Sequence, residues 1–174
     1  MINTHFTAEL HCKYGQIGVT QYPHAWAADL PAKYDGWLRP EHRGAHGFRP
    51  VEFNFQFIKQ TDRHIYTITA TGDWAYAGAR LEKSKNDWLG LYSTHVVGRV
   101  IDWATFGPLS AAEWKIEPLQ RWDGEPGSIS EVSFHLRDAD GHRVALINER
   151  GYYMNAGETP GEILTFTLGN VRLR

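Results

Sequence analysis

The chain has 174 residues, a formal net charge of -2, 42% hydrophobic residues and seven Trp. This composition excludes a disordered chain, and the length fits one domain with a substantial core. The small net charge gives no general attraction to nucleic acid, so no nucleic-acid partner is expected. No apolar run approaches the roughly 18 to 20 residues that span a bilayer, so no transmembrane segment is expected.

The N-terminus, MINTHFTAEL, lacks the basic start and apolar stretch of a secretory signal. The expected location is therefore cytoplasmic, or outside the cell after release without a recognisable signal peptide. Cys12 is the single cysteine, which excludes an intramolecular disulfide.

Alternation of apolar and polar residues, rich in β-branched and aromatic side chains, predicts strands along most of the chain. The strongest patterns are VEFNFQF at 51–57, EVSFHLR at 131–137 and ILTFTLG at 163–169. Weaker patterns predict strands at 6–10, 65–70, 77–81, 88–92, 144–147 and 152–155. Turn-forming residues separate them, as in TGDW, DADGH and ETPGE.

One segment, LSAAEWKIEPL at 109–119, has a helix-start pattern, with Ser110 as a possible N-cap and Glu113 three residues later. Pro118 would end such a helix early, so a single turn leading into a strand is expected. The predicted fold class is therefore all-β.

Three similar phrases, DGWL at 35–38, NDWL at 86–89 and RGYYM at 150–154, indicate three copies of one structural unit. The units cover about residues 5–60, 63–122 and 129–174. With the segments GQIGVTQYP at 15–23 and DGWLRPE at 35–41 added to the first unit, each unit has four predicted strands. The residues that match between units are Trp37, Trp88 and Tyr152 after the turn, and Phe55, Trp114 and Phe166 in the closing strand.

Three units of four strands resemble a β-trefoil. RGYYMNAG followed by LTFTL is similar to the repeat of fascin-like (actin-crosslinking-like) or ricin-B-like lectin domains, and this resemblance implies one β-trefoil domain. The chain departs from the ricin-type pattern because it has no Gln-x-Trp step, so no sugar site can be transferred from that motif. A closed antiparallel lipocalin-like barrel is the alternative fold, since both closures remove exposed strand edges.

The best candidates for ligand binding are the aromatic turns. A sugar presents an apolar C–H face and a rim of hydroxyls, so its site needs an aromatic platform beside a carboxylate or amide. The predicted ligand-binding residues are Asp35, Trp37, Asn86, Asp87, Trp88, Tyr92, Glu149, Tyr152 and Asn155.

For the three matched aromatics we favour a competing interpretation, in which they fill the core and the polar residues only shape turns. Four other tryptophans lie in predicted loops and are then better candidates for exposed binding residues: Trp26, Trp74, Trp103 and Trp122. A further hypothesis is anion recognition by Arg39, Arg43 and Arg49, which lie in one loop rich in Gly and Pro.

No catalytic residue or cofactor is predicted, because serine-nucleophile, P-loop and dinucleotide motifs are absent from the sequence. No metal site is predicted, because His42 and His46, four residues apart, lie in a loop rich in Gly and Pro, where that spacing loses its helical geometry. The leading functional hypothesis is non-catalytic, lectin-like binding of a carbohydrate or glycoconjugate in up to three weak pockets. The first alternative is a protein-binding module such as an inhibitor, toxin component or cytoskeletal-type binder. The second is a small barrel enzyme, cyclase-like or isomerase-like, with an interior pocket.

Overall fold

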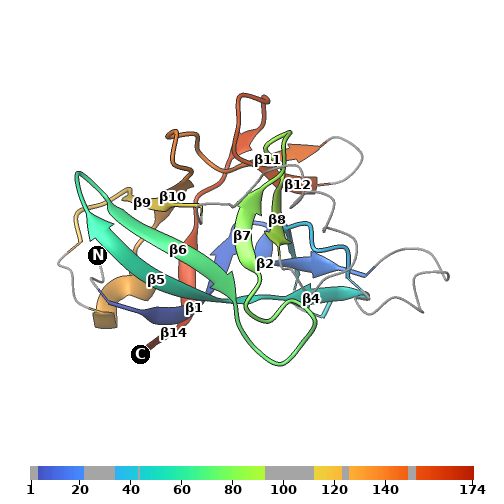
Figure 1. Cartoon of the computed structure of the whole chain (residues 1–174), viewed down its shortest axis with the longest axis horizontal. Helices are drawn as coiled ribbons and strands as arrows, with labels where there is room; N and C mark the ends of the chain where they lie inside the picture. Colours follow the sequence, from blue (N-terminus) through green and yellow to red (C-terminus); the bar gives the residue numbers. More distant parts are fainter. Residues whose placement is uncertain (1–3, 22–33, 43, 93–111, 123–125, 149–151) are drawn as a thin grey trace.

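Strands dominate the computed structural model, which confirms the all-β prediction (Figure 1). The structure describes residues 4–21, 34–42, 44–92, 112–122, 126–148 and 152–174. Within these ranges the one helical segment is a 3-10 turn, η2 (Pro126–Glu131). None of the described residues forms a helix with the length and hydropathy needed to cross a membrane.

The strands in chain order are β1 (Phe6–Cys12), β2 (Gly15–Thr20), β3 (Arg39–Glu41), β4 (Phe48–Pro50), β5 (Glu52–Gln60), β6 (His64–Ala70), β7 (Arg80–Lys83), β8 (Leu89–Tyr92), β9 (Trp114–Pro118), β10 (Phe134–Arg137), β11 (Ala145–Asn148), β12 (Tyr152–Asn155), β13 (Glu162–Ile163) and β14 (Thr167–Leu173).

The main sheet is antiparallel and strongly curled. Along it β10 pairs with β9, β9 with β6, β6 with β5, β5 with β1, and β1 with β14. Immediately before β14, Phe166 exchanges two backbone hydrogen bonds with Phe134 of β10, with N–O distances of 2.8 and 2.9 Å. This isolated bridge links the hydrogen-bonded path back to β10, and the curled sheet forms a half-barrel over the core. In Figure 1 the hairpin β7–β8 and the strands β11 and β12 lie to one side of the long β5–β6 pair.

Aromatic rings from the inner face of this sheet fill the core. Phe6 stacks on Phe55 with ring centroids 4.7 Å apart, and Tyr66 meets both rings edge-on. Trp114 and Phe166 are also fully buried, and the indole N–H of Trp114 donates to the carbonyl of Leu81 at 2.9 Å. All three residues matched in the predicted closing strands are thus core residues.

The predicted strands are present, with differences at their ends. The strand expected at 77–81 begins at Arg80, because a turn comes first in which the amide of Ala79 donates to the carbonyl of Tyr76 at 2.9 Å. ILTFTLG is divided between β13 and β14. The described part of 109–119 leads into β9, as the early Pro predicts. No sequence pattern indicated η2.

Three segments that are distant in sequence meet through backbone hydrogen bonds. The amide of Leu38 donates to Leu89 O at 3.0 Å, the amide of Met154 donates to Leu38 O at 3.1 Å, and the amide of Ala156 donates to Asp87 O at 3.0 Å. We call these three segments, 36–38, 87–91 and 154–156, the backbone junction. They belong to the three phrases of the predicted repeat, whereas the threefold repeat and the β-trefoil themselves stay predictions.

Replacement of Phe166 by Ala is expected to destabilise the protein by about 3–5 kcal/mol. The mutation removes a fully buried ring at the point where β10 meets the residues that lead into β14. The matched control is Ile163→Ala, three residues earlier and 47% exposed, with an expected loss below about 0.5 kcal/mol. Urea unfolding measures both, and equal losses for the two variants would contradict the described packing.

Candidate ligand-binding site

Asp35 is held in a defined position by the turn that precedes the backbone junction. Its carboxylate accepts a hydrogen bond from the amide of Trp37 at 3.0 Å and one from the hydroxyl of Thr20 at 3.4 Å. Gly36 between them has a φ of 74°, and a Cβ at this position would lie 2.7 Å from the hydroxyl oxygen of Tyr76. Glycine is therefore required here, and the Asp35 carboxylate is fixed by an Asx-type turn.

Two tyrosines from distant segments complete the group. The hydroxyl of Tyr153 donates to the carboxylate of Asp35 at 3.5 Å, and the guanidinium of Arg39 lies 5.7 Å from the centre of the Tyr153 ring. The ring of Tyr92 meets Trp37 edge-on, with centroids 6.5 Å apart. All five of these residues are half-buried. Together they form what we call the aromatic cluster.

The pKa of the Tyr153 hydroxyl is raised, first by burial and then by the negative charge of Asp35. The hydroxyl therefore stays protonated and able to donate at neutral pH. Tyr153, whose ring lies under the Arg39 guanidinium, donates to the Asp35 carboxylate, and the backbone amide of Trp37, whose ring meets Tyr92, donates to the same carboxylate. An aromatic platform and a fixed acceptor are the combination that a sugar requires.

The expectation that the three matched aromatics fill the core is wrong. Trp37 and Trp88 are half-buried, and Tyr152 is 50% exposed. The residues that follow the two tryptophans, Leu38 and Leu89, are buried instead. Because neighbours along a strand point to opposite faces, burial of the leucine directs the preceding indole away from the core.

In the third segment the residue that corresponds to Trp37 is Tyr153 and not Tyr152. Met154, which follows Tyr153, is buried and donates its amide to Leu38 at the backbone junction. Tyr152 is the first residue of β12, where it pairs with Asn148 and contacts its side-chain amide at 3.3 Å. Sequence reasoning therefore missed Tyr153 as a member of the site, although the doubled tyrosine could have indicated it.

The predicted residues of the second phrase shape a turn. The amide of Asp87 donates to Ser84 O at 2.9 Å, and Asp87 itself has a φ of 63°. The amide of Trp88 donates to the hydroxyl of Ser84 at 3.1 Å. Asn155, from the third phrase, is 1% exposed and donates its side-chain amide to Asn86 O at 3.0 Å. Asn155 is thus a buried link between segments, while Glu149 lies outside the described residues.

A buried ion pair lies next to this turn. The ammonium of Lys83 is 2.6 Å from the carboxylate of Asp138, 2.9 Å from that of Asp87 and 3.0 Å from the carbonyl of Ala156. Burial of Asp138 would raise its pKa, but the hydrogen bonds from Lys83 and His142 outweigh burial, and the pKa of Asp138 is lowered. Asp87 is therefore engaged in an ion pair with Lys83, and Lys83 also joins this turn to the third segment through the carbonyl of Ala156.

Asp138, Asp140 and His142 place possible metal-ligand atoms within 4.8 Å of one another. The Lys83 ammonium already supplies positive charge at Asp138, whose carboxylate also accepts the amide of His142 at 2.7 Å. The hairpin turn and the ion pair account for this arrangement without a metal ion.

The loop tryptophans that the structure describes are anchored. Trp74 donates its indole N–H to Thr71 O at 2.9 Å, and Trp122 donates to the hydroxyl of Ser128 at 2.7 Å. Both indoles are half-buried, as Trp37 is, and pack against the core, so the fully exposed loop tryptophans that were expected are not found at these two positions. Trp26 and Trp103 lie outside the described residues.

The arginines of the predicted anion-recognition loop lie over different aromatic rings. Arg39 lies over Tyr153, whereas the guanidinium of Arg49 lies 4.7 Å from the centre of the Trp74 ring. Arg43 lies outside the described residues. No protein-family model, no curated protein and no solved structure matches this chain, so the site is interpreted from its own geometry.

Replacement of Asp138 by Asn is expected to lower the free energy of unfolding by about 2 kcal/mol at pH 7, because the mutation leaves Lys83 without its closest carboxylate. A lowered folded-state pKa stabilises the protein above the unfolded-state value, and this contribution disappears as the pH falls through the folded-state pKa. The difference between variant and wild type should therefore shrink at acidic pH.

Urea unfolding at neutral and acidic pH measures this difference. The matched control is Asp140→Asn, an exposed carboxylate in the same turn, which should change stability little at either pH. A difference for Asp138→Asn that stays constant down to the most acidic pH would contradict the ion-pair explanation.

Proposed function

We propose that this protein is a non-catalytic carbohydrate-binding protein with a β-trefoil fold, and that the aromatic cluster is its binding site. The observation that carries the proposal is that the Asp35 carboxylate binds both the hydroxyl of the half-buried Tyr153 and the backbone amide of the half-buried Trp37. Asp35 and Tyr153 are more than a hundred positions apart in the sequence, yet the backbone junction holds their segments together.

Each member of the cluster has a role in this proposal. The indole of Trp37 is the platform for the apolar face of a sugar ring, and Asp35 accepts hydrogen bonds from the sugar hydroxyls. The contacts of Asp35 with Thr20 and Tyr153 are long, at 3.4 and 3.5 Å, so a ligand hydroxyl at about 2.7 Å would compete with them successfully. Arg39 supplies charged donors at the rim of the site.

One composite site is expected in place of three separate pockets. Asp87 is used in an ion pair, and Asn155 is buried in a hydrogen bond to Asn86. The three phrases therefore contribute side chains to one cluster, and the expected stoichiometry is one sugar per chain.

The β-trefoil part of the proposal is supported by two arrangements. The strands β1, β5, β6, β9, β10 and β14 form a closed hydrogen-bonded path, and the other matched segments meet at the backbone junction. Both are arrangements that three units of four strands would produce.

A protein-binding role is the second candidate, and one surface feature favours it. Tyr14 and Ile163 are 37% and 47% exposed, and the hydroxyl of Tyr14 contacts the carboxylate of Glu162, the neighbour of Ile163. This small apolar area with a charged border is typical of an interface rim. The barrel-enzyme alternative has no such support, because aromatic rings fill the described core.

A printed glycan array followed by titration calorimetry with the best-bound glycan tests the proposed function. Trp37→Ala and Asp35→Asn should each weaken binding at least about tenfold, because they remove the platform and the acceptor. The matched control is Tyr152→Ala, which removes a more exposed ring outside the cluster and should leave the affinity unchanged.

Circular dichroism of each variant separates loss of binding from loss of fold. Equal weakening by Tyr152→Ala would contradict the composite site and favour the third pocket expected from the sequence. No binding to any glycan, together with stoichiometric capture of one protein that excess sugar does not displace, would favour the protein-binding role.

A further inference from the structure

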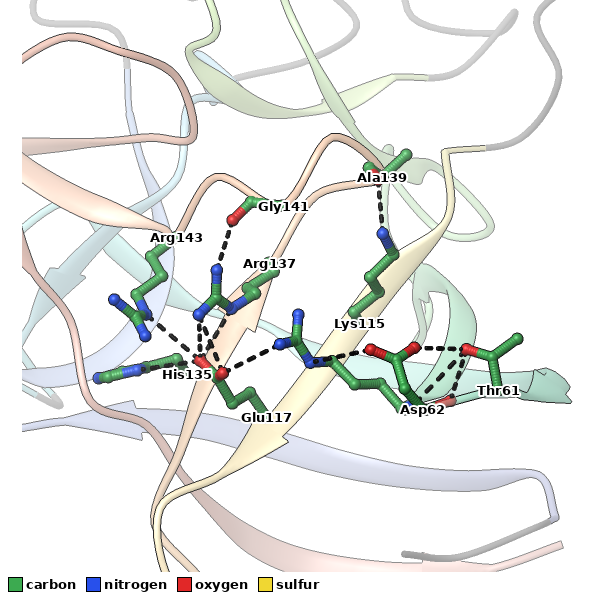
Figure 2. Close-up of polar contacts among 10 residues, drawn as sticks. Thr61, Asp62, Lys115, Glu117, His135, Arg137, Ala139, Gly141 and Arg143 are labelled. Atoms are coloured by element: carbon green, nitrogen blue, oxygen red, sulfur yellow. Dashed lines mark hydrogen bonds and ion pairs between the residues drawn. The ribbon is translucent and has the colours of Figure 1, made fainter.

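A second polar cluster, which shares no residue with the aromatic cluster, lies on the outer face of β9 and β10. Its centre is Glu117 of β9, whose strand neighbour Ile116 is fully buried in the core. Figure 2 shows His135, Arg137 and Arg143 converging on the Glu117 carboxylate, with Lys115 further along the same strand. We call Arg63, Lys115, Glu117, His135, Arg137 and Arg143 the arginine cluster.

Three guanidinium groups contact the single carboxylate of Glu117. Arg137 binds it in a bidentate manner, with Nε–Oε2 and Nη2–Oε1 distances of 2.8 and 2.9 Å. Arg143 Nε and Arg63 Nη2 lie at longer distances, both 3.3 Å. One bidentate arginine already satisfies a carboxylate well, so the other two arginines exceed what Glu117 requires.

The strand pairing places like charges next to one another. Arg137 is the cross-strand partner of Lys115 on one side and of Arg143 on the other. Like charges directly opposite on paired strands are destabilising. Glu117 and the exposed Asp62, which lies 3.9 Å from Arg63, are the carboxylates that contact this group in the described part of the chain. Positive charge therefore remains in excess.

The excess donors are available at the surface. The guanidinium of Arg137 also donates to the carbonyl of Gly141, so its nitrogens are engaged. Within the described residues, by contrast, neither terminal nitrogen of Arg143 has a partner, and Arg63 uses one of its two. The side chains of Arg143 and Arg63 are 38% and 30% exposed, compared with 15% for Arg137.

The titration behaviour of neighbouring groups agrees with a positive local potential. The pKa of His135 is lowered by burial and then by the charge of Arg143, in spite of the opposing effect of Glu117. Burial would raise the pKa of Glu117, but the hydrogen bonds from Arg137 and Arg143 lower it. His135 is consequently neutral at neutral pH, and the positive charge comes from the arginines and Lys115.

We propose that the arginine cluster binds a tetrahedral oxyanion, the phosphate or sulfate group of a small ligand, between Arg63 and Arg143. Guanidinium groups offer paired N–H donors that match the oxygen spacing of such groups, and several of them together neutralise the charge. Glu117 positions the arginines, and its negative charge offsets part of the positive charge that would attract the anion. This proposal does not depend on sugar binding by the aromatic cluster.

Titration calorimetry of the full chain with sodium phosphate and with sodium sulfate, against sodium chloride at equal ionic strength, tests the proposal. Saturable binding of one oxyanion is expected. Arg143→Gln and Arg63→Gln should each weaken it about tenfold, because each removes a charge-assisted hydrogen bond. Glu117→Gln should tighten binding severalfold, since it removes a negative charge next to the anion. The arginine variants test the site even where the Glu117 variant does not fold.

The matched control is Arg172→Gln, an arginine with a 67% exposed side chain that pairs with Glu52 outside the cluster and should leave binding unchanged. A second arm compares a monosaccharide sulfate with the same unsubstituted sugar. Tighter binding of the sulfate ester than of inorganic sulfate indicates a sugar-borne group, and equal binding indicates a free oxyanion. Absence of saturable binding above chloride, or equal weakening by Arg172→Gln, would overturn the proposal.

Discussion

The backbone hydrogen bonds of the junction determine where the groups of the aromatic cluster lie. Leu38, Leu89 and Met154 are buried there. The amide of Leu38 donates to the carbonyl of Leu89 at 3.0 Å, and the carbonyl of Leu38 accepts from the amide of Met154 at 3.1 Å. Breaking one such bond in the interior would leave an unpaired polar group, which costs about 1–3 kcal/mol. The side chains that point outward from these same segments, Trp37 and Tyr153, therefore project from backbone whose position these hydrogen bonds fix.

The sequence predicts the core strands well because one face of each strand is buried. Phe134 and Leu136 alternate with polar neighbours, as do Phe166 and Leu168, and all four are buried. A register slip of one residue would expose every one of these side chains, so the alternation is under strong physical constraint. Strand ends lack this constraint, which is why the start of β7 at Arg80 was not predicted.

The site could be predicted only in part, because its geometry depends on contacts between segments. The sequence selected Asp35, Trp37 and Tyr92, all members of the aromatic cluster. Of the two adjacent tyrosines the sequence selected Tyr152, whereas Tyr153 is the one that contacts Asp35. Two adjacent aromatics point to opposite faces, and pairing with β11 decides which one faces the cluster. Tertiary contacts determine both that pairing and the burial of Asn155, so the local sequence pattern does not reveal either.

The electrostatic character of the surface is also a tertiary property. The twelve arginines are spread along the chain and the net charge is only -2, so neither quantity indicates a cationic site. Antiparallel pairing of β9 with β10 brings Arg137 beside Lys115, and the following turn returns Arg143 to the same face. Because Arg137 then lies between two cations, Glu117 reduces their repulsion without cancelling it. Such a concentration of like charge lowers stability, and a bound anion is the simplest physical means of offsetting that cost.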